Sequence, residues 1–542
     1  MTAAGFLLAS TLALPLLMVI AALWPSVRVK LLSLLPIAPL PAIATAILAP
    51  GGSLALAPAP LRLTLALDDP GALLLGGAGL LWCAAGFYAS TYMCKSSHRS
   101  AFAIWWLLTL TGSLGVFIVA DMTSFYLAFA LVSLSAYGLV AYEGTPAARR
   151  AGTIYMVLAL LGEALLLLAF VMIAAGTTGG NPMIRDAVAL LPSSPWCGPI
   201  IVLLILGFGL KMGLVPLHVW MPLAHPVAPM PASAVLSGII VKAGIIGLIR
   251  FLPLDAAMPG WGMALMALGL FTAFYAVLIG LTQLHPKVVL AYSTVSQMGL
   301  VGGVLGAGLM AGTPGTATLA AFYALHHMLV KGALFLGVGI VATTGRRHTR
   351  YLMATMALLA LSLAGLPFTS SMLAKLAVKD LFGNGVAMLL ATLSATGSTL
   401  LMLHFLRRVS TLIEDGDQRA EPGLLWPWVV IAAASLIVSW ALFPAATGYP
   451  LSAVFTAKAL WAACWPILFG GILALALQSY ADRLPRIPAG DAVVLAEAML
   501  PGLKRLMDVL ERVDGLLRQW QVAGLALLII VLALGASLQL GP

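Results

Sequence analysis

Residues 207–251 read GFGLKMGLVPLHVWMPLAHPVAPMPASAVLSGIIVKAGIIGLIRF, and this stretch decides the fold class. It is mostly apolar, yet it holds two lysines in its interior, Lys211 and Lys242. A lysine at the middle of a bilayer costs roughly 2.5–3.5 kcal/mol on insertion scales, so such a residue is a functional candidate by default. Pro216 follows Lys211, and a proline inside a helix removes a backbone hydrogen bond. The stretch therefore predicts two membrane spans, the first of them broken close to a buried charge.

The whole chain has the composition of a membrane protein. Of its 542 residues, 62% are hydrophobic and 8% are charged, and its mean hydropathy is +1.06. Soluble domains carry roughly 25% charged residues. A span needs about 20 apolar residues. By this measure we predict an all-α, polytopic membrane protein of about sixteen spans, at 4–24, 31–50, 71–92, 101–120, 122–142, 152–176, 199–221, 232–252, 261–283, 288–310, 316–342, 351–381, 384–406, 425–443, 459–478 and 519–538.

The distribution of basic residues predicts the orientation. With the N-terminus outside, nineteen of the 28 Lys and Arg residues fall in inner connections and three in outer ones. The positive-inside rule favours this arrangement, with both termini outside and the chain in a bacterial inner (cytoplasmic) membrane. The net charge of +10 then needs no nucleic-acid partner. A segment at about 488–518 has the pattern of an amphipathic surface helix, either a linker or a docking face for another subunit.

Further polar residues interrupt the apolar spans in the second half of the chain. The pair His326 and His327 precedes Lys331 in YALHHMLVKGALFLG, and Lys375 follows Pro367 in AGLPFTSSMLAKLAVKD. Histidine titrates near neutral pH, so a histidine pair beside a buried lysine suits a proton relay. Metal binding is a weaker interpretation of the pair, because no carboxylate or cysteine cluster accompanies it.

Other titratable residues lie in or near the spans of the first half. Glu163 is the carboxylate best centred in a span, and we interpret it as functional. His218 and His225 flank the inner end of span 199–221, although a lone membrane histidine more often forms an interhelical hydrogen bond. Arg250 and Lys379 lie near span ends, where long side chains snorkel to the interface.

Pro216 and Pro367 fall five spans apart, which suggests two repeats, since broken helices at matching places mark inverted-repeat transporters. The predicted organisation is N-terminal spans at 1–100, a first repeat at 101–252, a second repeat at 253–406, and C-terminal spans with the amphipathic segment at 407–542.

Motifs for bound cofactors are not found. The four cysteines form no CxxC pair and none has a histidine at metal-ligand spacing. The chain has no GxGxxG after a strand and no Walker-type loop. We therefore predict no catalytic residue, cofactor or metal in this chain.

Four blocks in the same order resemble one family. The stretch 207–251 and three further blocks are similar to the antiporter-like, proton-conducting membrane subunits of complex I, group 4 (formate hydrogenlyase-type) hydrogenases and Mrp antiporters, and most similar to the large hydrogenase-4-type subunit. The further blocks are HPKVVLAYSTVSQMGLVGG at 285–303, ALHHMLVKGALFLGVG at 324–339 and LAGLPFTSSMLAKL at 363–376. The resemblance covers roughly residues 100 to 405.

The resemblance implies two inverted five-helix repeats, at helices 4–8 and 9–13, with helices 7 and 12 broken. It also implies a polar axis through Lys211, Lys242, the His326/His327 pair with Lys331, and Lys375 as the group that exchanges protons with the outer side. The chain would be a non-catalytic subunit that moves protons, or alternatively sodium, powered by a reaction in partner subunits.

The partner subunits remain open at this stage. An oxidoreductase complex of the NADH-quinone oxidoreductase or hydrogenase type, with membrane and soluble subunits, is the leading expectation. The alternatives are a Mrp-type cation/proton antiporter, the membrane half of a proton-driven inorganic-carbon uptake module, and an unrelated transporter working alone.

One position departs from the family pattern. The family carries a glutamate on helix 5 in a block like FELMSL, and it pairs with the lysine of helix 7. Here residues 129–134 read FALVSL, so Ala130 stands in its place. Either Glu163 supplies the carboxylate to Lys211, or the first half-channel is rewired or idle.

Overall fold

The computed structural model describes residues 2–57, 62–177, 182–477, 485–491 and 493–494. The chain divides into two units, Met1–Ala489 and Gly490–Pro542, and the architecture below is that of the first. The predicted last span at 519–538 and most of the predicted amphipathic segment at 488–518 lie outside the described residues.

Apolar helices make up most of the described chain, as expected where backbone groups must bond within their own segment. Thirteen spans among the described residues are long and apolar enough to cross a membrane. They are α1 (Ala3–Ala21), α3–η1–α4 (Leu31–Leu48), α5 (Asp69–Tyr92), α6 (Arg99–Ile118), α7 (Met122–Val140), α8 (Pro146–Ala175), α12–η3–α13 (Met230–Phe251), α14 (Pro259–Leu281), α15 (Pro286–Ala311), α16 (Thr316–Ala342), α19 (Val386–Ser410), α20 (Pro422–Thr447) and α21 (Ala457–Leu477).

Two further predicted spans are each divided into two helices. They are α10 (Cys197–Met212) with α11 (Trp220–Val227), and α17 (Thr349–Ala364) with α18 (Ser370–Val378). Pro216 and Pro367 lie in the connections. Gly213 (φ 84°) ends α10 and Gly365 (φ 115°) ends α17, both in the left-handed conformation in which glycine commonly terminates a helix. The total of sixteen spans stays a prediction, because the last one is not described.

The connections hold short elements, among them a β-hairpin that the all-α prediction did not include. Strand β1 (Ser53–Ala57) pairs antiparallel with β2 (Leu63–Ala66). Leu65 also bridges to Val119 at the end of α6. The other short elements are α2 (Pro25–Arg28), α9 (Ile184–Leu190), η2 (Leu191–Ser193), η4 (Arg346–His348), η5 (Lys379–Phe382) and η6 (Leu451–Phe455).

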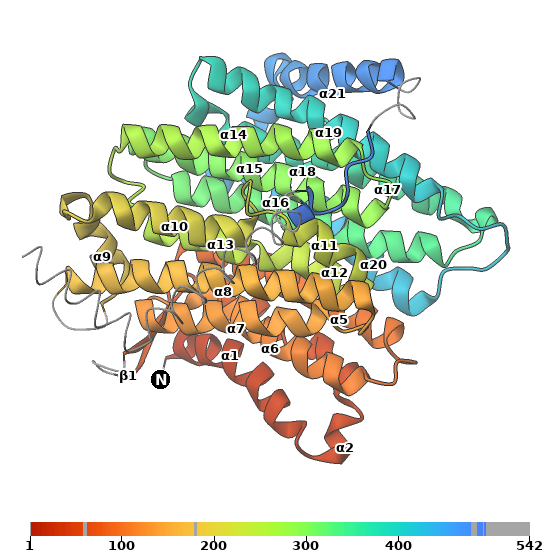
Figure 1. Cartoon of the computed structure of the whole chain (residues 1–542), viewed down its shortest axis with the longest axis horizontal. Coiled ribbons are helices and arrows are strands. Elements are labelled where there is room, and N and C mark those ends of the chain that lie inside the picture. Colours follow the sequence, from red (N-terminus) through yellow and green to blue (C-terminus); the bar gives the residue numbers. More distant parts are fainter. Residues whose placement is uncertain (1, 58–61, 178–181, 478–484, 492, 495–542) are drawn as a thin grey trace, which may run out of the picture. The chain divides into compact units, whose positions relative to one another are not determined.

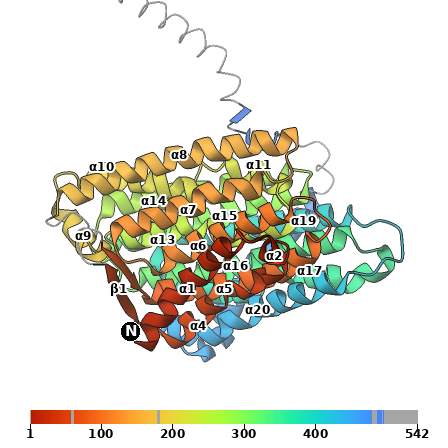
Figure 2. The ribbon, with the colours of Figure 1, turned by 90° about the horizontal axis from the view of Figure 1, so that it is seen from below.

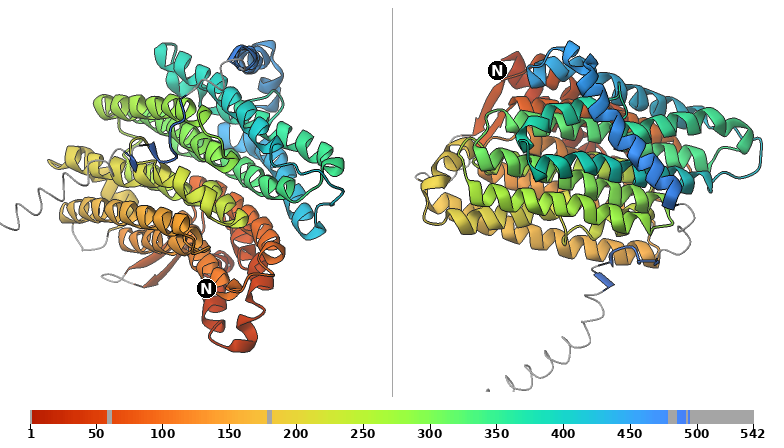
Figure 3. Two further views of the ribbon diagram at one scale, coloured as in Figure 1. Left: turned by 45° about the vertical axis from the view of Figure 1, so that its right-hand side comes forward. Right: turned by 90° about the horizontal axis from the view of Figure 1, so that it is seen from above.

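The helices of the first unit run roughly alongside one another in layers (Figure 1). In Figure 2, α8 lies along one side of the bundle, and α20 and α4 lie along the other. Helix α21, blue in the right panel of Figure 3, crosses the bundle and packs on α19. Spans α12–α13, α15 and α16 are buried over their whole apolar window, so they form the core.

Glycines allow α14 and α15 to pack closely. A Cβ at Gly269 of α14 would lie 2.4 Å from the Gly303 nitrogen and 2.5 Å from the Gly299 oxygen on α15. A helix that can approach its neighbour this closely holds α15 firmly against the core, and α15 carries several polar residues of the site below.

Candidate functional site

A lysine–histidine pair lies in the core between α13 and α16. Lys242 is fully buried, and its Nζ lies 2.7 Å from Nδ1 of His327, which is also fully buried. The same ammonium donates a 3.1 Å hydrogen bond to the backbone oxygen of Ser237. Ser237 belongs to η3 (Leu236–Ile240), a π-helical turn, and such turns are frequent at functional sites.

The polar row continues along α16. Lys331, fully buried, donates from Nζ to the Leu290 oxygen at 2.9 Å, and its charge is within electrostatic range of Lys242. Nδ1 of His326 lies 2.8 Å from the hydroxyl of Ser370, the first residue of α18. The structure therefore brings together residues from α13, α15, α16 and the broken span.

Lys375 ends this row at the interruption between α17 and α18. Its Nζ donates to the carbonyl oxygen of Ala364, the last residue of α17, where the broken helix leaves carbonyls free. It is within electrostatic range of His326 and lines a cavity of about 110 Å³, which α21 walls with small residues such as Ala462 and Ala463.

Lys211, in the last turn of α10, is held by hydroxyl groups. Its Nζ donates to Oγ of Ser133 at 3.0 Å and to the hydroxyl of Tyr155 at 3.1 Å. It also lies 5.4 Å and 5.7 Å from the ring centroids of Tyr155 and Phe129, a cation–π arrangement. Sequence reasoning missed Ser133 and Tyr155.

Glu163 lies on α8, next to this cluster. Its side chain is buried, and it is within electrostatic range of Lys211. No hydrogen bond joins it directly to that lysine, but Ser133, which binds Lys211, lies close enough to interact with the carboxylate as well. Tyr155, which bonds Lys211, is also within electrostatic range of Glu163.

The two remaining histidines of the prediction are fully buried. His218 lies in the connection between α10 and α11 with its ring 5.6 Å from that of Tyr275 and 6.0 Å from that of Tyr292. His225 lies on α11 with its ring 4.9 Å from that of Phe335 on α16.

A second unanticipated group is a neutral hydrogen-bond chain beside His326. The Tyr323 hydroxyl donates to Oε1 of Gln297 at 2.7 Å, and Nε2 of Gln297 donates to Oγ of Ser398 at 2.9 Å. The rings of Tyr323 and His326 are 6.1 Å apart. This chain joins α16, α15 and α19, and we interpret it as support for the row.

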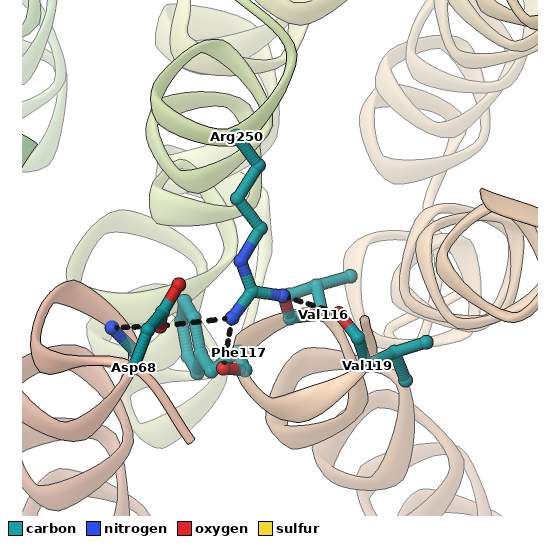
Figure 4. A network of polar contacts seen from close by, with 6 residues as sticks. Asp68, Val116, Phe117, Val119 and Arg250 are labelled. Carbon is teal, nitrogen blue, oxygen red and sulfur yellow. Dashed lines mark hydrogen bonds and ion pairs between the residues drawn. The ribbon is translucent and has the colours of Figure 1, made fainter. Parts of the chain in front are cut away.

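Arg250 does not simply snorkel, as its position near a span end had suggested. Its guanidinium donates to the oxygens of Val116 (3.0 Å), Phe117 (2.6 Å) and Val119 (2.6 Å) at the end of α6, and to Asp68 at 3.1 Å, as Figure 4 shows. A cation favours the carbonyl end of a helix. Arg250 thereby joins α13 to α6 and to the start of α5, beside a cavity of about 870 Å³.

Known proteins are similar to this chain. The family described as NADH:quinone oxidoreductase/Mrp antiporter, TM, matches residues 119–403. Hydrogenase-4 component B of Escherichia coli strain K12 is 33% identical over 300 residues, which are 53% of this chain and 44% of that protein. Na(+)/H(+) antiporter subunit A1 of Staphylococcus saprophyticus is 30% identical over 343 residues, 58% of this chain and 42% of that one. The chain spans less than half the length of these curated relatives.

Two solved structures share the fold. The structure of the Mrp complex from Dietzia sp. DQ12-45-1b matches 99% of this chain and 63% of that chain, with a TM-score of 0.78 and 22% identity. The membrane-bound sulfane sulfur reductase, an archaeal respiratory membrane complex, matches 87% of this chain and 99% of that chain, with a TM-score of 0.70 and 20% identity. The chain is thus a multi-pass membrane protein with the antiporter-like fold.

All the buried lysines and histidines described above lie within residues 119–403, the part of the chain that the family covers. Because this part is more than half of the chain, the protein belongs to the NADH:quinone oxidoreductase/Mrp antiporter transmembrane family.

Proposed function

We propose that this chain moves protons across the membrane, as a non-catalytic subunit of a multi-subunit energy-converting complex. The observation that carries the proposal is the row of buried groups Lys242, His327, His326, Lys331 and Lys375. An intramembrane lysine is expensive and a mark of ion pathways. Here the row runs from the core of the first half of the chain to the interrupted helix of the second.

The physical basis is coupling between neighbouring charges. Two unit charges about 4 Å apart interact by roughly 4 kcal/mol at an effective dielectric constant of 20. The arrival of a proton on one group therefore alters the proton affinity of the next. A reaction in a partner subunit that displaces one charge would drive the others in turn, without any group facing both sides.

Substitution of the row tests this function. Lys331→Ala and Lys375→Ala should abolish coupled proton translocation by the assembled complex in membrane vesicles, while the complex still assembles. Lys458→Ala, an exposed lysine at the start of α21, is the matched control and should translocate normally. Normal proton translocation by either buried-lysine variant would refute the proposal. Uptake assays that measure sodium instead of protons would show which of these two ions the chain moves.

In this proposal the first half-channel contains Lys211 and the two hydroxyl groups that bind it, those of Ser133 and Tyr155. Glu163 is the carboxylate beside them. Their electrostatic proximity supports this role for Glu163, in the absence of a glutamate at Ala130. Glu163→Gln should slow translocation. Unchanged flux would instead favour a first half that transmits conformational change only.

We also propose two inverted repeats, 101–252 and 253–406, between N-terminal spans at 1–100 and C-terminal spans at 407–542. The support is that both broken spans end their first helix on a left-handed glycine followed by a proline in the connection. Placement in a bacterial inner membrane with both termini outside is part of the same proposal, supported by the excess of basic residues in the inner connections.

The relatives suggest two kinds of complex in which this chain would find its partner subunits. A relative named as a hydrogenase component favours a redox complex, whereas a relative named as an antiporter subunit favours a Mrp-type cation/proton antiporter. Purification of the tagged chain in mild detergent, with metal analysis and an optical spectrum, separates them. Soluble subunits with iron–sulfur or nickel signals would support the first, and a metal-free set of membrane subunits the second.

A further inference from the structure

Lys287 is a buried charge that the row above does not use. It lies in the connection between the predicted spans 261–283 and 288–310, but its side chain is only 3% exposed. Its Nζ donates a 2.6 Å hydrogen bond to the backbone oxygen of Ala228. Ala228 is the residue that caps the end of α11, so the ammonium lies at the carbonyl end of that helix.

A small polar network connects the Lys287 side chain to the backbone of His225. The hydroxyl of Ser233 on α12 lies 3.2 Å from the Ala228 oxygen and 3.0 Å from the His225 oxygen. Lys287 and Ser233 thus share the Ala228 oxygen at the turn between α11 and α12. In Figure 1 these two helices are labelled on the side of the bundle away from β1 and α9.

His225 is unusual among the groups nearby. It is fully buried, and neither ring nitrogen has a hydrogen-bond partner among the described residues. A buried imidazole without partners is costly, and such a group commonly reflects a functional role or an unseen water. His225 is within electrostatic range of both Lys287 and Lys331, so its ring can interact with this turn and with the row.

Glu143 is an exposed carboxylate that interacts with Lys287. It follows the last turn of α7. It also interacts with Tyr92, the last residue of α5. His285, two residues before Lys287, caps α15. Its Nδ1 accepts a 3.2 Å hydrogen bond from the backbone nitrogen of Lys287. Burial, followed by the charge of Lys287, lowers the pKa of His285, which keeps this cap neutral.

We propose that Glu143, Lys287 and His225 form the entrance by which protons reach Lys331 from the end of the bundle where α7 ends and α15 begins. This inference rests on the proposed function and adds an access route to it. Lys287, protonated at rest, passes a proton to a ring nitrogen of His225, and His225 passes a proton to Lys331 when that amine is neutral. The Glu143 carboxylate, protonated by hydronium from solution, then returns a proton to the neutral amine of Lys287. Water carries the proton between these groups, because neither ring nitrogen of His225 is hydrogen-bonded to a described residue. Each donor loses one proton and each acceptor gains one, so every group returns to its starting state.

The competing role for Lys287 is a static cap of the α11 carbonyl end, because a cation there is favourable by itself. The substitution Lys287→Arg separates the two roles. Arginine keeps the positive charge and the donors, but it does not release its proton. A cap should survive this change, whereas a relay group should not.

The experiment measures proton uptake by membrane vesicles that contain the assembled complex, together with the thermal stability of the purified complex. Lys287→Arg should lower the uptake rate by about tenfold or more, with unchanged stability. Glu143→Gln should lower it by a smaller factor, and the exposed Glu414→Gln should not change it. Normal uptake by Lys287→Arg, or by Glu143→Gln, would overturn the entrance.

Two further variants keep the outcome interpretable. Lys331→Ala in the same vesicles tests the row itself: normal uptake there refutes the proposed function, whereas lost uptake there with normal Lys287→Arg refutes only the entrance. If Lys287→Arg is unstable, Lys287→Cys in a background without the four native cysteines replaces it. Alkylation with bromoethylamine then restores an amine, and restored uptake supports the entrance, while a fully modified protein without uptake overturns it.

Discussion

Replacement of Arg250 by methionine removes the donor that holds the ends of α5, α6 and α13 together. Three backbone oxygens, those of Val116, Phe117 and Val119, lose their charged hydrogen-bond partner, and Asp68 loses its ion pair. Methionine fills a similar volume without donors, so the change isolates these bonds from packing.

The cost follows from the number of bonds and from access to water. A hydrogen bond to a charged group contributes about 1.5–3 kcal/mol. The cavity of about 870 Å³ beside Arg250 lets water replace part of the three carbonyl bonds, so we expect about 3 kcal/mol in total, below the full sum. The pair with Asp68 adds at most about 1 kcal/mol, because the Asp68 side chain is 50% exposed.

Thermal unfolding of the purified complex in detergent measures this loss. We expect Arg250→Met to lower Tm by about 3–6 °C, and Arg250→Lys by about half as much, since lysine keeps the charge but not the fork of donors. The control is Arg185→Met, because the Arg185 side chain is 94% exposed at the same cavity. A Tm for Arg250→Met within about 1 °C of the control would refute the reasoning.

Three shorter predictions concern single contacts. Tyr155→Phe removes one of two hydroxyls that bind Lys211, and proton uptake should fall several-fold; wild-type uptake would show that the remaining hydroxyl suffices. Gly269→Ala should destabilise the protein by about 1–3 kcal/mol, because the new methyl group meets α15 backbone, whereas Gly260→Ala, with open space around it, should leave Tm unchanged. Gln297→Leu leaves the buried hydroxyl of Tyr323 unpaired, while that of Ser398 keeps its bond to the Ser394 oxygen, and should lower Tm by a few degrees; an unchanged Tm in thermal unfolding would contradict this.

Two features of the sequence predicted most of the fold and the site: the long apolar runs and the lysines that interrupt them. Thirteen spans are recognisable because a helix in lipid needs a long apolar run, and the lysines stand out because they are rare there. Pro216 and Pro367 predicted breaks for the same local reason, and the structure has connections at both positions. Family membership needed longer blocks of sequence, which periodicity alone does not provide.

The partners of the charged groups could not be predicted in the same way. Ser133 and Tyr155 are ordinary polar residues of their helices, and only the rotation of α7 and α8 brings them to Lys211. Lys287 follows a proline at a helix start, a pattern typical of an exposed connection, yet neighbouring helix ends cover it. Arg250 likewise needed the end of α6, more than a hundred residues earlier in the chain, to become a bound group.

The π-helical turn Leu236–Ile240 sets the direction of everything after it on α13. An extra residue in one turn shifts the following face by about 100° compared with an uninterrupted α-helix of 3.6 residues per turn. Lys242 and Arg250 lie eight positions apart on α13, about 80° from each other around its axis at 3.6 residues per turn, and the same shift sets the direction of both. A rotation of α13 about its axis would therefore change two sets of contacts at once. These are the Lys242–His327 contact in the core and the hydrogen bonds of Arg250 to the end of α6.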